Sequence, residues 1–219
     1  MLLVTDTPQP NQPRVIDLGR RSYEPVHEEM LATLEQVRRG ESPGVVFLVE
    51  HDPVYTAGRA TPADQLRDDI VEIERGGQIT YHGPGQLVIY PVVRLPKKDV
   101  RAWLRALEAF GVAVCAKFGL RGVPSVDGTG VFVGDPVDGA RKIASIGVAI
   151  RHWINLHGIS LNVDMDLTAF HSIRPCGLDP NVMTDLRRET GRSISLDEAR
   201  TAAAACLPAL LGSGYSSGE

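Results

Sequence analysis

The chain has 219 residues, a length that fits one large domain or at most two small ones. Hydrophobic residues make up 43% of it, so a sizeable core can form, and a net charge of -4 provides no general basic field for nucleic acid or an anionic membrane. No apolar run approaches a membrane span, and the first six residues lack the features of a secretory signal. With only three cysteines, a disulfide framework is not expected, and we predict a reducing, cytoplasmic location.

The two ends of the chain differ in composition from its middle. Residues 7–14 are rich in Pro, Gln and Asn, and residues 212–219 are rich in Gly and Ser. Both compositions are typical of linking or disordered segments. No repeat or composition break falls between them, so we expect one domain over residues 15–211 and a disordered tail over residues 212–219.

Three segments have the apolar spacing of amphipathic helices, namely residues 23–39, 99–118 and 195–211. Their ends carry typical capping residues, which satisfy backbone groups that a helix leaves unpaired. The predicted caps are Ser22 and Gly40 for the first helix and, for the third, a capping box of Ser195 and Glu198.

Between these helices lie apolar or alternating segments typical of strands, namely residues 44–50, 86–93, 130–133, 142–151 and 157–163. The third and fourth flank turn-forming residues and predict a hairpin. In the last, Ile159 and Leu161 fall on one side. Pro91 suggests that residues 86–93 lie at a sheet edge or contain a bulge. Strand clusters interrupted by irregularly placed helices predict the α+β class, with mixed β-sheets and flanking helices.

Cys176 is the cysteine that the sequence offers as a nucleophile. A proline precedes it and a glycine follows it, which predicts a loop, and Arg174 nearby would favour the thiolate. Cys115 and Cys206 fall on apolar helix faces and are expected to be structural. The competing interpretation is that Cys176 is also a small buried residue, as most cysteines are.

Lys142 begins a predicted strand just after a turn. Most lysines at such places are solvated strand ends. If the residue is buried, desolvation lowers its pKa, and a neutral amine could accept the proton of a thiol. In its ammonium form the same group would instead stabilise a thiolate. Both roles stay open at this point.

The densest polar motif is the glycine-rich segment 75–86, which reads RGGQITYHGPGQ. Its glycines allow the backbone to approach a ligand closely, and several polar residues exceed what an ordinary turn requires. It has neither the Walker A nor the GxGxxG pattern, so phosphate binding by those routes is unsupported. The competing interpretation is a glycine-rich hairpin with a polar loop.

Six histidines are present, and none has the spacing of an HExxH or related metal motif, so no metal site is expected. His82 and His157 lie beside glycines and are the better site candidates. His27 is expected on a helix surface. Surface or structural roles are expected for His51, His152 and His171. The GxSxG motif of serine hydrolases is absent from the sequence.

Five blocks, in this order along the chain, resemble one family closely, the octanoyltransferases of lipoate biosynthesis. They are EHDPVYTAGR at residues 50–59, RGGQITYHGPGQLVIYP at 75–91, RKIASIGV at 141–148, HGISLNV at 157–163 and PCG at 175–177. Several such blocks in register are far more specific than a lone glycine pattern.

This resemblance implies a single domain with the fold of biotin and lipoate protein ligases and a two-step transfer without a cofactor. Cys176 would take octanoyl from an acyl-carrier-protein thioester, and Lys142 would assist proton transfer. The acceptors would be lipoyl domains of 2-oxoacid dehydrogenase complexes and the glycine cleavage H protein. The implied substrate-binding residues are Arg75, Gly76, Gly77, Gln78, Ile79, Thr80, Tyr81, His82, Ser145, Ile146, Gly147, Gly158, Ile159 and Ser160.

Thioester exchange also requires donors for the oxyanion and an apolar slot for the acyl chain. Our candidates for the donors are backbone amides near Gly76 and Gly77 or at Gly177. For the slot they are Ala144, Ile146 and Leu161.

Residues 178–183, LDPNVM, depart from the aromatic-containing segment that is usual in the family, which bears on lid contacts and partner docking. Two alternatives to the transferase are an ATP-dependent lipoate or biotin ligase and a non-catalytic module that binds lipoyl domains.

Overall fold

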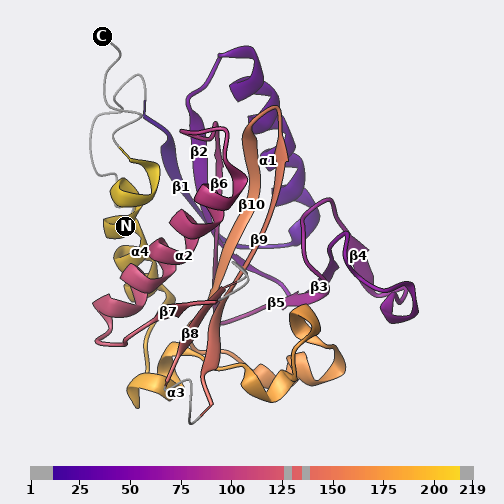
Figure 1. Cartoon of the computed structure of the whole chain (residues 1–219), viewed down its shortest axis with the longest axis vertical. Helices are drawn as coiled ribbons and strands as arrows, with labels where there is room; N and C mark the ends of the chain where they lie inside the picture. Colours follow the sequence, from indigo (N-terminus) through magenta and orange to yellow (C-terminus); the bar gives the residue numbers. More distant parts are fainter. Residues whose placement is uncertain (1–11, 126–129, 135–138, 213–219) are drawn as a thin grey trace.

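Figure 1 shows the computed structural model of the chain, which describes residues 12–125, 130–134 and 139–212 and, for Cys176, the backbone alone. A mixed sheet of seven strands forms its centre. Their spatial order is β1 (Arg14–Arg21), β2 (Gly44–His51), β6 (Gln86–Val93), β10 (Ile154–Asn162), β9 (Arg141–Arg151), β8 (Gly130–Val133) and β7 (Val123–Pro124). A small sheet beside it has the order β4 (Ile70–Glu72), β3 (Val54–Ala57) and β5 (Thr80–His82).

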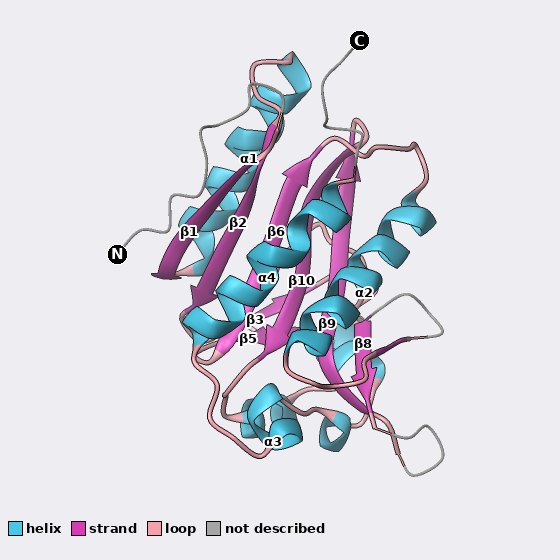
Figure 2. Ribbon diagram, turned by 90° about the vertical axis from the view of Figure 1, so that its left-hand side faces the viewer, coloured by secondary structure: helices cyan, strands magenta, loops and turns pink. Residues whose placement is uncertain are grey.

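The helices of the described residues are α1 (Tyr23–Arg39), α2 (Val100–Lys117), α3 (Leu186–Thr190) and α4 (Leu196–Leu211). Short 3-10 helices are η1 (Ala63–Gln65), η2 (Leu167–Ser172), η3 (Pro175–Gly177) and η4 (Pro180–Val182). In Figure 2, α2 and α4 lie side by side on one face of the large sheet, and α1 lies on the other. We call these the α2 face and the α1 face.

Because side chains alternate along the strands, the large sheet contributes residues to two hydrophobic cores, one on the α2 face and one on the α1 face. In β6, Leu87 and Ile89 pack on the α2 face, and Val88 and Tyr90 pack on the α1 face. Successive residues of a strand point to opposite faces, so a strand that is apolar throughout must be covered on both sides. The continuous apolar run at residues 86–93 is therefore explained by helices on both faces.

The predicted α+β class, the three long helices and the β8–β9 hairpin are confirmed. The capping box of Ser195 and Glu198 is present, and Gly40 ends α1 in the left-handed conformation. The side chain of Ser22 makes no capping hydrogen bond, so that detail is wrong. Arg14, expected in a linker, already belongs to β1. Residues 1–11 and 213–219, which hold most of the expected linker and tail, lie outside the described residues.

Pro91 lies in the middle of the large sheet, so the prediction of an edge strand is wrong. Strand β6 pairs with β2 on one side and with β10 on the other. The ladder between β6 and β10 ends at Ile159 opposite Ile89 and resumes only as a bridge between Ile154 and Arg94. Because proline has no N–H for a ladder, it is accommodated where this pairing is interrupted.

The same register places Pro91 opposite His157, whose ring departs from the side-chain alternation of β10. His157 has a φ of 61°, in the left-handed region. Strict alternation would put its ring with Ile159 on the α2 face. The ring instead lies against Tyr90 and His27, on the α1 face. One inverted residue therefore delivers a buried histidine to the opposite side of the sheet.

Asn155 fills the gap in the ladder with its side-chain amide. Its Nδ2 donates to the carbonyl oxygens of Pro91, at 2.7 Å, and His157, at 2.9 Å. Its Oδ1 accepts from the indole N–H of Trp103 at 2.9 Å. A buried amide with all these partners replaces the hydrogen bonds that the strands do not make with each other.

Among the described residues, no helix combines the length and the apolar character that crossing a bilayer requires.

Replacing Asn155 by Ala should lower the free energy of unfolding by about 2–4 kcal/mol, because two carbonyls and an indole N–H lose buried partners. Denaturant unfolding of the purified protein measures this loss. Asn181→Ala, at an exposed position, serves as the control and should change the free energy by no more than about 0.5 kcal/mol. Equal losses in the two variants would contradict the bridging role of Asn155.

Candidate active site

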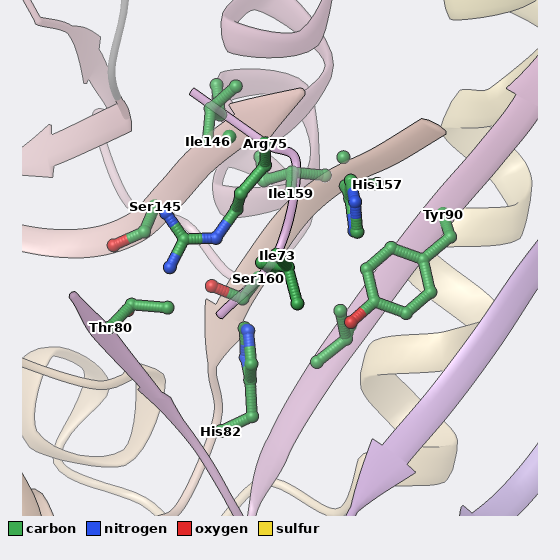
Figure 3. Close-up of a pocket in the computed structure, with 13 residues that line it drawn as sticks. Ile73, Arg75, Thr80, His82, Tyr90, Ser145, Ile146, His157, Ile159 and Ser160 are labelled. Atoms are coloured by element: carbon green, nitrogen blue, oxygen red, sulfur yellow. The ribbon is translucent and has the colours of Figure 1, made fainter. Parts of the chain in front are cut away.

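An open cavity lies on the α1 face of the large sheet, beside β5 (Figure 3). Its floor comes from β6, β9 and β10, and the polar groups of Arg75, Ser160 and His82 surround it. The cavity therefore combines an apolar floor with a few polar groups.

Most of the predicted substrate-binding residues line this cavity, namely Arg75, Thr80, His82, Ser145, Ile146, Gly147, Gly158, Ile159 and Ser160. Ile79 and Tyr81 instead pack into a separate apolar cluster around Phe170. Gly76, Gly77 and Gln78 are also absent from the lining. The structure thus brings the blocks 75–82, 145–147 and 158–160 together, although they are far apart in the sequence.

The wall also contains Ile73, Val88 and Tyr90, which sequence reasoning did not select. It contains His157 as well, which the sequence indicated as a site candidate. Val88 and Tyr90 could have been found from the alternation of β6, because they share a face with each other. Of the residues expected in an acyl slot, Ile146 borders the cavity, but its side chain packs in the core of the α2 face together with Ala144 and Leu161. The expectation of an acyl slot lined by these three side chains is therefore wrong.

Arg75 fixes the start of the glycine-rich segment from inside the protein. The residue is buried, and its guanidinium donates to the carbonyl oxygens of Gly76 and Gln78 at 3.0 and 2.7 Å. It also donates to the carbonyl and hydroxyl oxygens of Thr56 in β3, at 2.7 and 2.9 Å. A planar guanidinium can serve several acceptors at once, so one side chain ties this segment to the small sheet.

Two of the three candidate oxyanion donors are already engaged. The amide of Gly76 donates to the carbonyl of Val148 at 2.9 Å, and that of Gly177 donates to the carbonyl of Arg174 at 3.0 Å. For the amide of Gly77, no hydrogen bond is found among the described residues. Of these three amides, that of Gly77 therefore stays available for a ligand.

A relay of buried hydrogen bonds joins the glycine-rich segment to the strand that carries Lys142. His82 Nδ1 lies 2.6 Å from Gln86 Oε1, and Gln86 Nε2 donates to Asn162 Oδ1 at 2.9 Å. Asn162 Nδ2 then donates to the carbonyl of Thr184 at 2.9 Å, and the amide of Thr184 donates to the carbonyl of Lys142 at 3.0 Å. Because each amide uses both its donor and its acceptor, the relay fixes their orientation.

Burial keeps the histidines of this region neutral. It lowers the pKa of His82 to about 3, and it also lowers the pKa of His51 and His157. Since the partner of His82 Nδ1 is a carbonyl oxygen, Nδ1 carries the proton and Nε2 is an acceptor. His51 is buried and contacts the hydroxyl of Tyr90, which agrees with the expected structural role. His152 and His171 are exposed.

His27 differs from the expected helix-surface residue. It is part-buried, and its Nε2 lies 3.2 and 3.3 Å from the two carboxylate oxygens of Glu74. Sequence reasoning did not select Glu74 at all, because it lies just outside the glycine-rich motif. The two residues meet on the α1 face beside His157.

Lys142 is completely buried, so the interpretation as a solvated strand end is wrong. Its Nζ lies 5.8 Å from the centroid of the Phe132 ring and makes no hydrogen bond among the described residues. The backbone of Lys142 forms a bridge with Met183, in the segment that follows η3. An amine without a hydrogen-bond partner is costly to bury, which marks this group as a functional candidate.

Cys176 lies in η3, a short helix that contacts β5. The preceding proline occupies the first turn, where its missing N–H is harmless. Gly177 has a φ of 78° and lies against the side-chain amide of Gln78. The backbone of the cysteine is thus beside the glycine-rich segment, and its meeting with Lys142 stays a prediction. Cys115 and Cys206 are buried as expected, and burial raises the pKa of Cys115 to about 12.

Comparison with known proteins identifies the family of this chain. Residues 27–207 match the family model of the lipoyl protein ligase A/B catalytic domain. An octanoyltransferase of Salinispora tropica is 41% identical over 90% of this chain and 95% of its own length. An octanoyltransferase of Pseudomonas entomophila is 46% identical, over 84% and 86% of the two lengths. The chain belongs to the octanoyltransferase family.

Membership of this family makes the chain an acyltransferase. A putative lipoate protein ligase from T. acidophilum, solved with bound lipoic acid, has the same fold, with a TM-score of 0.70 at 18% identity over 91% of this chain and 86% of that one. A lipoate-protein ligase A bound with ATP gives a TM-score of 0.68 at 19% identity, over 91% and 85%. The fold expected for an octanoyltransferase is thereby confirmed.

Replacing Lys142 by Met should leave the free energy of unfolding unchanged or raise it by about 1–3 kcal/mol, since a buried amine without a partner becomes an apolar side chain of similar length. Denaturant unfolding measures the change. The control, Lys117→Met at an exposed helix end, should have almost no effect. A clear loss of stability in Lys142→Met would mean that the amine has a stabilising partner in the folded protein.

The free energy of unfolding should fall as the pH falls from 7 to 5, and His82 should contribute to this slope. In the unfolded chain, His82 has the ordinary histidine pKa of about 6.5 and binds a proton as the pH falls through this value. In the folded protein, the pKa of His82 is about 3, so the side chain stays neutral. The slope in His82→Asn should therefore be shallower, by up to about 1.4 kcal/mol per pH unit.

Denaturant unfolding at several pH values tests this, with His171→Gln, at an exposed position, as the control that keeps the wild-type slope. A slope in His82→Asn equal to that of wild type would show that His82 is protonated in the folded protein.

Proposed function

We propose that the chain transfers an octanoyl group from octanoyl-acyl carrier protein to the lysine of a lipoyl domain, in the cytoplasm, during endogenous lipoate biosynthesis. The name of its relatives, octanoyltransferase, supports the acyl group. A solved archaeal relative in fold is described as a lipoate protein ligase with its E2 lipoyl domain, which supports the kind of acceptor. The proposed acceptors are lipoyl domains of 2-oxoacid dehydrogenase complexes and the glycine cleavage H protein.

Cys176 is the proposed nucleophile, and the reaction has two steps. The Cys176 thiolate attacks the carbonyl carbon of the carrier thioester, a new C–S bond forms, and the carrier thiolate leaves. The amine of the acceptor lysine then attacks the acyl-cysteine, an amide forms, and the Cys176 thiolate leaves. The first step exchanges one thioester for another, so a thiol suits the task better than a hydroxyl.

The observation that carries this proposal is the complete burial of the Lys142 amine without a hydrogen-bond partner among the described residues. In the proposed cycle, Lys142 takes the thiol proton of Cys176 and gives it to the departing carrier thiolate. It then accepts a proton from the attacking acceptor amine. The ammonium group then returns this proton to the Cys176 thiolate, which restores the thiol and the neutral amine for the next cycle.

The cavity wall suits the acyl chain in this reaction. Ile73, Val88 and the ring of Tyr90 supply apolar surface. At about 0.8 kcal/mol for each buried CH₂ group, an eight-carbon chain would contribute several kcal/mol of binding free energy. The amide of Gly77 is the proposed donor to the oxyanion, because the neighbouring candidates Gly76 and Gly177 already donate to carbonyls. We propose residues 15–211 as the catalytic domain and residues 212–219 as a tail outside it.

Incubation with octanoyl-acyl carrier protein should add the mass of one octanoyl group to the chain, on Cys176. Intact-mass analysis followed by peptide mapping measures this. Cys176→Ala should neither gain the group nor transfer it to a lipoyl domain. The matched control is Cys115→Ala, which removes a buried structural cysteine and should keep both activities.

Full transfer by Cys176→Ala would overturn the covalent route. Product formation from free octanoate and ATP, with no use of the carrier thioester, would instead favour the ligase alternative. A wild-type chain that binds a lipoyl domain but never acquires an acyl group would favour the non-catalytic binding module.

A further inference from the structure

We propose that His27, Glu74 and His157 form a binding site for a divalent transition-metal ion of the zinc type. This site goes beyond the proposed transfer, which uses no metal. The three residues come from α1, from the segment just before the glycine-rich motif, and from β10. One ligand atom of each lies within 4.8 Å of the ligand atoms of the others.

The distances between the donor atoms fit a small tetrahedral ion. His27 Nε2 lies 3.2 Å from Glu74 Oε2, and His157 Nε2 lies 3.6 Å from the same oxygen. Zinc binds histidine nitrogen and carboxylate oxygen at about 2.0–2.2 Å, which separates neighbouring tetrahedral ligands by roughly 3.3 Å. Small side-chain rotations would therefore bring all three atoms into the coordination shell of one ion.

The chemistry of the donors also fits. Two histidines and one glutamate are a known zinc-binding set that leaves a fourth position for water or another ligand. His157 Nε2 is buried and has no hydrogen-bond partner among the described residues, which a metal bond would supply. This orphaned nitrogen faces the carboxylate, so the geometry points to a shared ligand between them.

Two arginines oppose a cation here. Arg151 Nη2 lies 3.8 Å from Glu74 Oε1, and the side chain is about half exposed, so it can move away. The guanidinium of Arg75 belongs to the same cavity wall as His157. Its position is fixed by hydrogen bonds to backbone carbonyls and Thr56. Arg151 therefore competes with a metal ion for the Glu74 carboxylate, and a substitution of Arg151 would remove this competition.

The test is a titration of the full chain with Co²⁺, followed by competition with Zn²⁺, in a Cys176→Ser background that removes one thiol ligand. We expect one Co²⁺ per chain, with the visible absorption of tetrahedral nitrogen and oxygen coordination. Glu74→Gln and His27→Gln should each weaken binding by about tenfold or more, and His171→Gln, at an exposed histidine, should not. Arg151→Gln should tighten binding by roughly twofold to tenfold, because a competing positive charge is gone.

Zn²⁺ should also raise the unfolding temperature of the chain, since the ion would bind the folded state only. Circular dichroism establishes that each variant is folded, and if Glu74→Gln is not, His27→Gln decides. Equal affinity in wild type and His27→Gln, no binding at all, or a thiolate-to-cobalt charge-transfer band would overturn the site.

Discussion

Pro91 lacks the backbone N–H that a strand in the middle of a sheet would normally donate to its neighbour. This missing donor affects how β6 and β10 pair beside the cavity. The ladder between β6 and β10 is interrupted beside it, and the side chain of Asn155 takes over the free carbonyls. Opposite the proline, His157 inverts its backbone and turns its ring to the α1 face. The next residue must be glycine, because a Cβ there would collide with the carbonyl oxygen of Ile89. The part of the cavity wall that His157 and Gly158 form thus lies beside the interruption at Pro91.

Around this interruption, the buried polar groups are satisfied with few exceptions. The relay from His82 to the backbone of Lys142 crosses β5, β6, β10 and β9 and gives each amide a defined orientation. The amine of Lys142 and Nε2 of His157 depart from this pattern. Natural proteins accept such local costs mainly where function requires them. The proposed proton transfer and the proposed metal site each give one of these atoms a role.

The electrostatics of the cavity suit an uncharged ligand. Burial keeps the rings of His82 and His157 neutral. The one charge of Arg75 is directed into protein carbonyls and Thr56. An apolar floor under neutral rings offers an acyl chain contact without a penalty for desolvating a charge. The net charge of the chain does not predict this neutral cavity, because the charge of each histidine depends on its burial and its neighbours.

The sequence by itself determined the elements and the family. The apolar spacing of α1, α2 and α4, the capping box and the hairpin depend on residues close in the chain, and the five motif blocks identify the family without coordinates. Only the tertiary structure decided what depends on distant partners. The burial of Lys142, the central place of β6 and the inverted ring of His157 arise from pairing across the sheet. Glu74 and His27 stand 47 positions apart, and folding alone brings their side chains together.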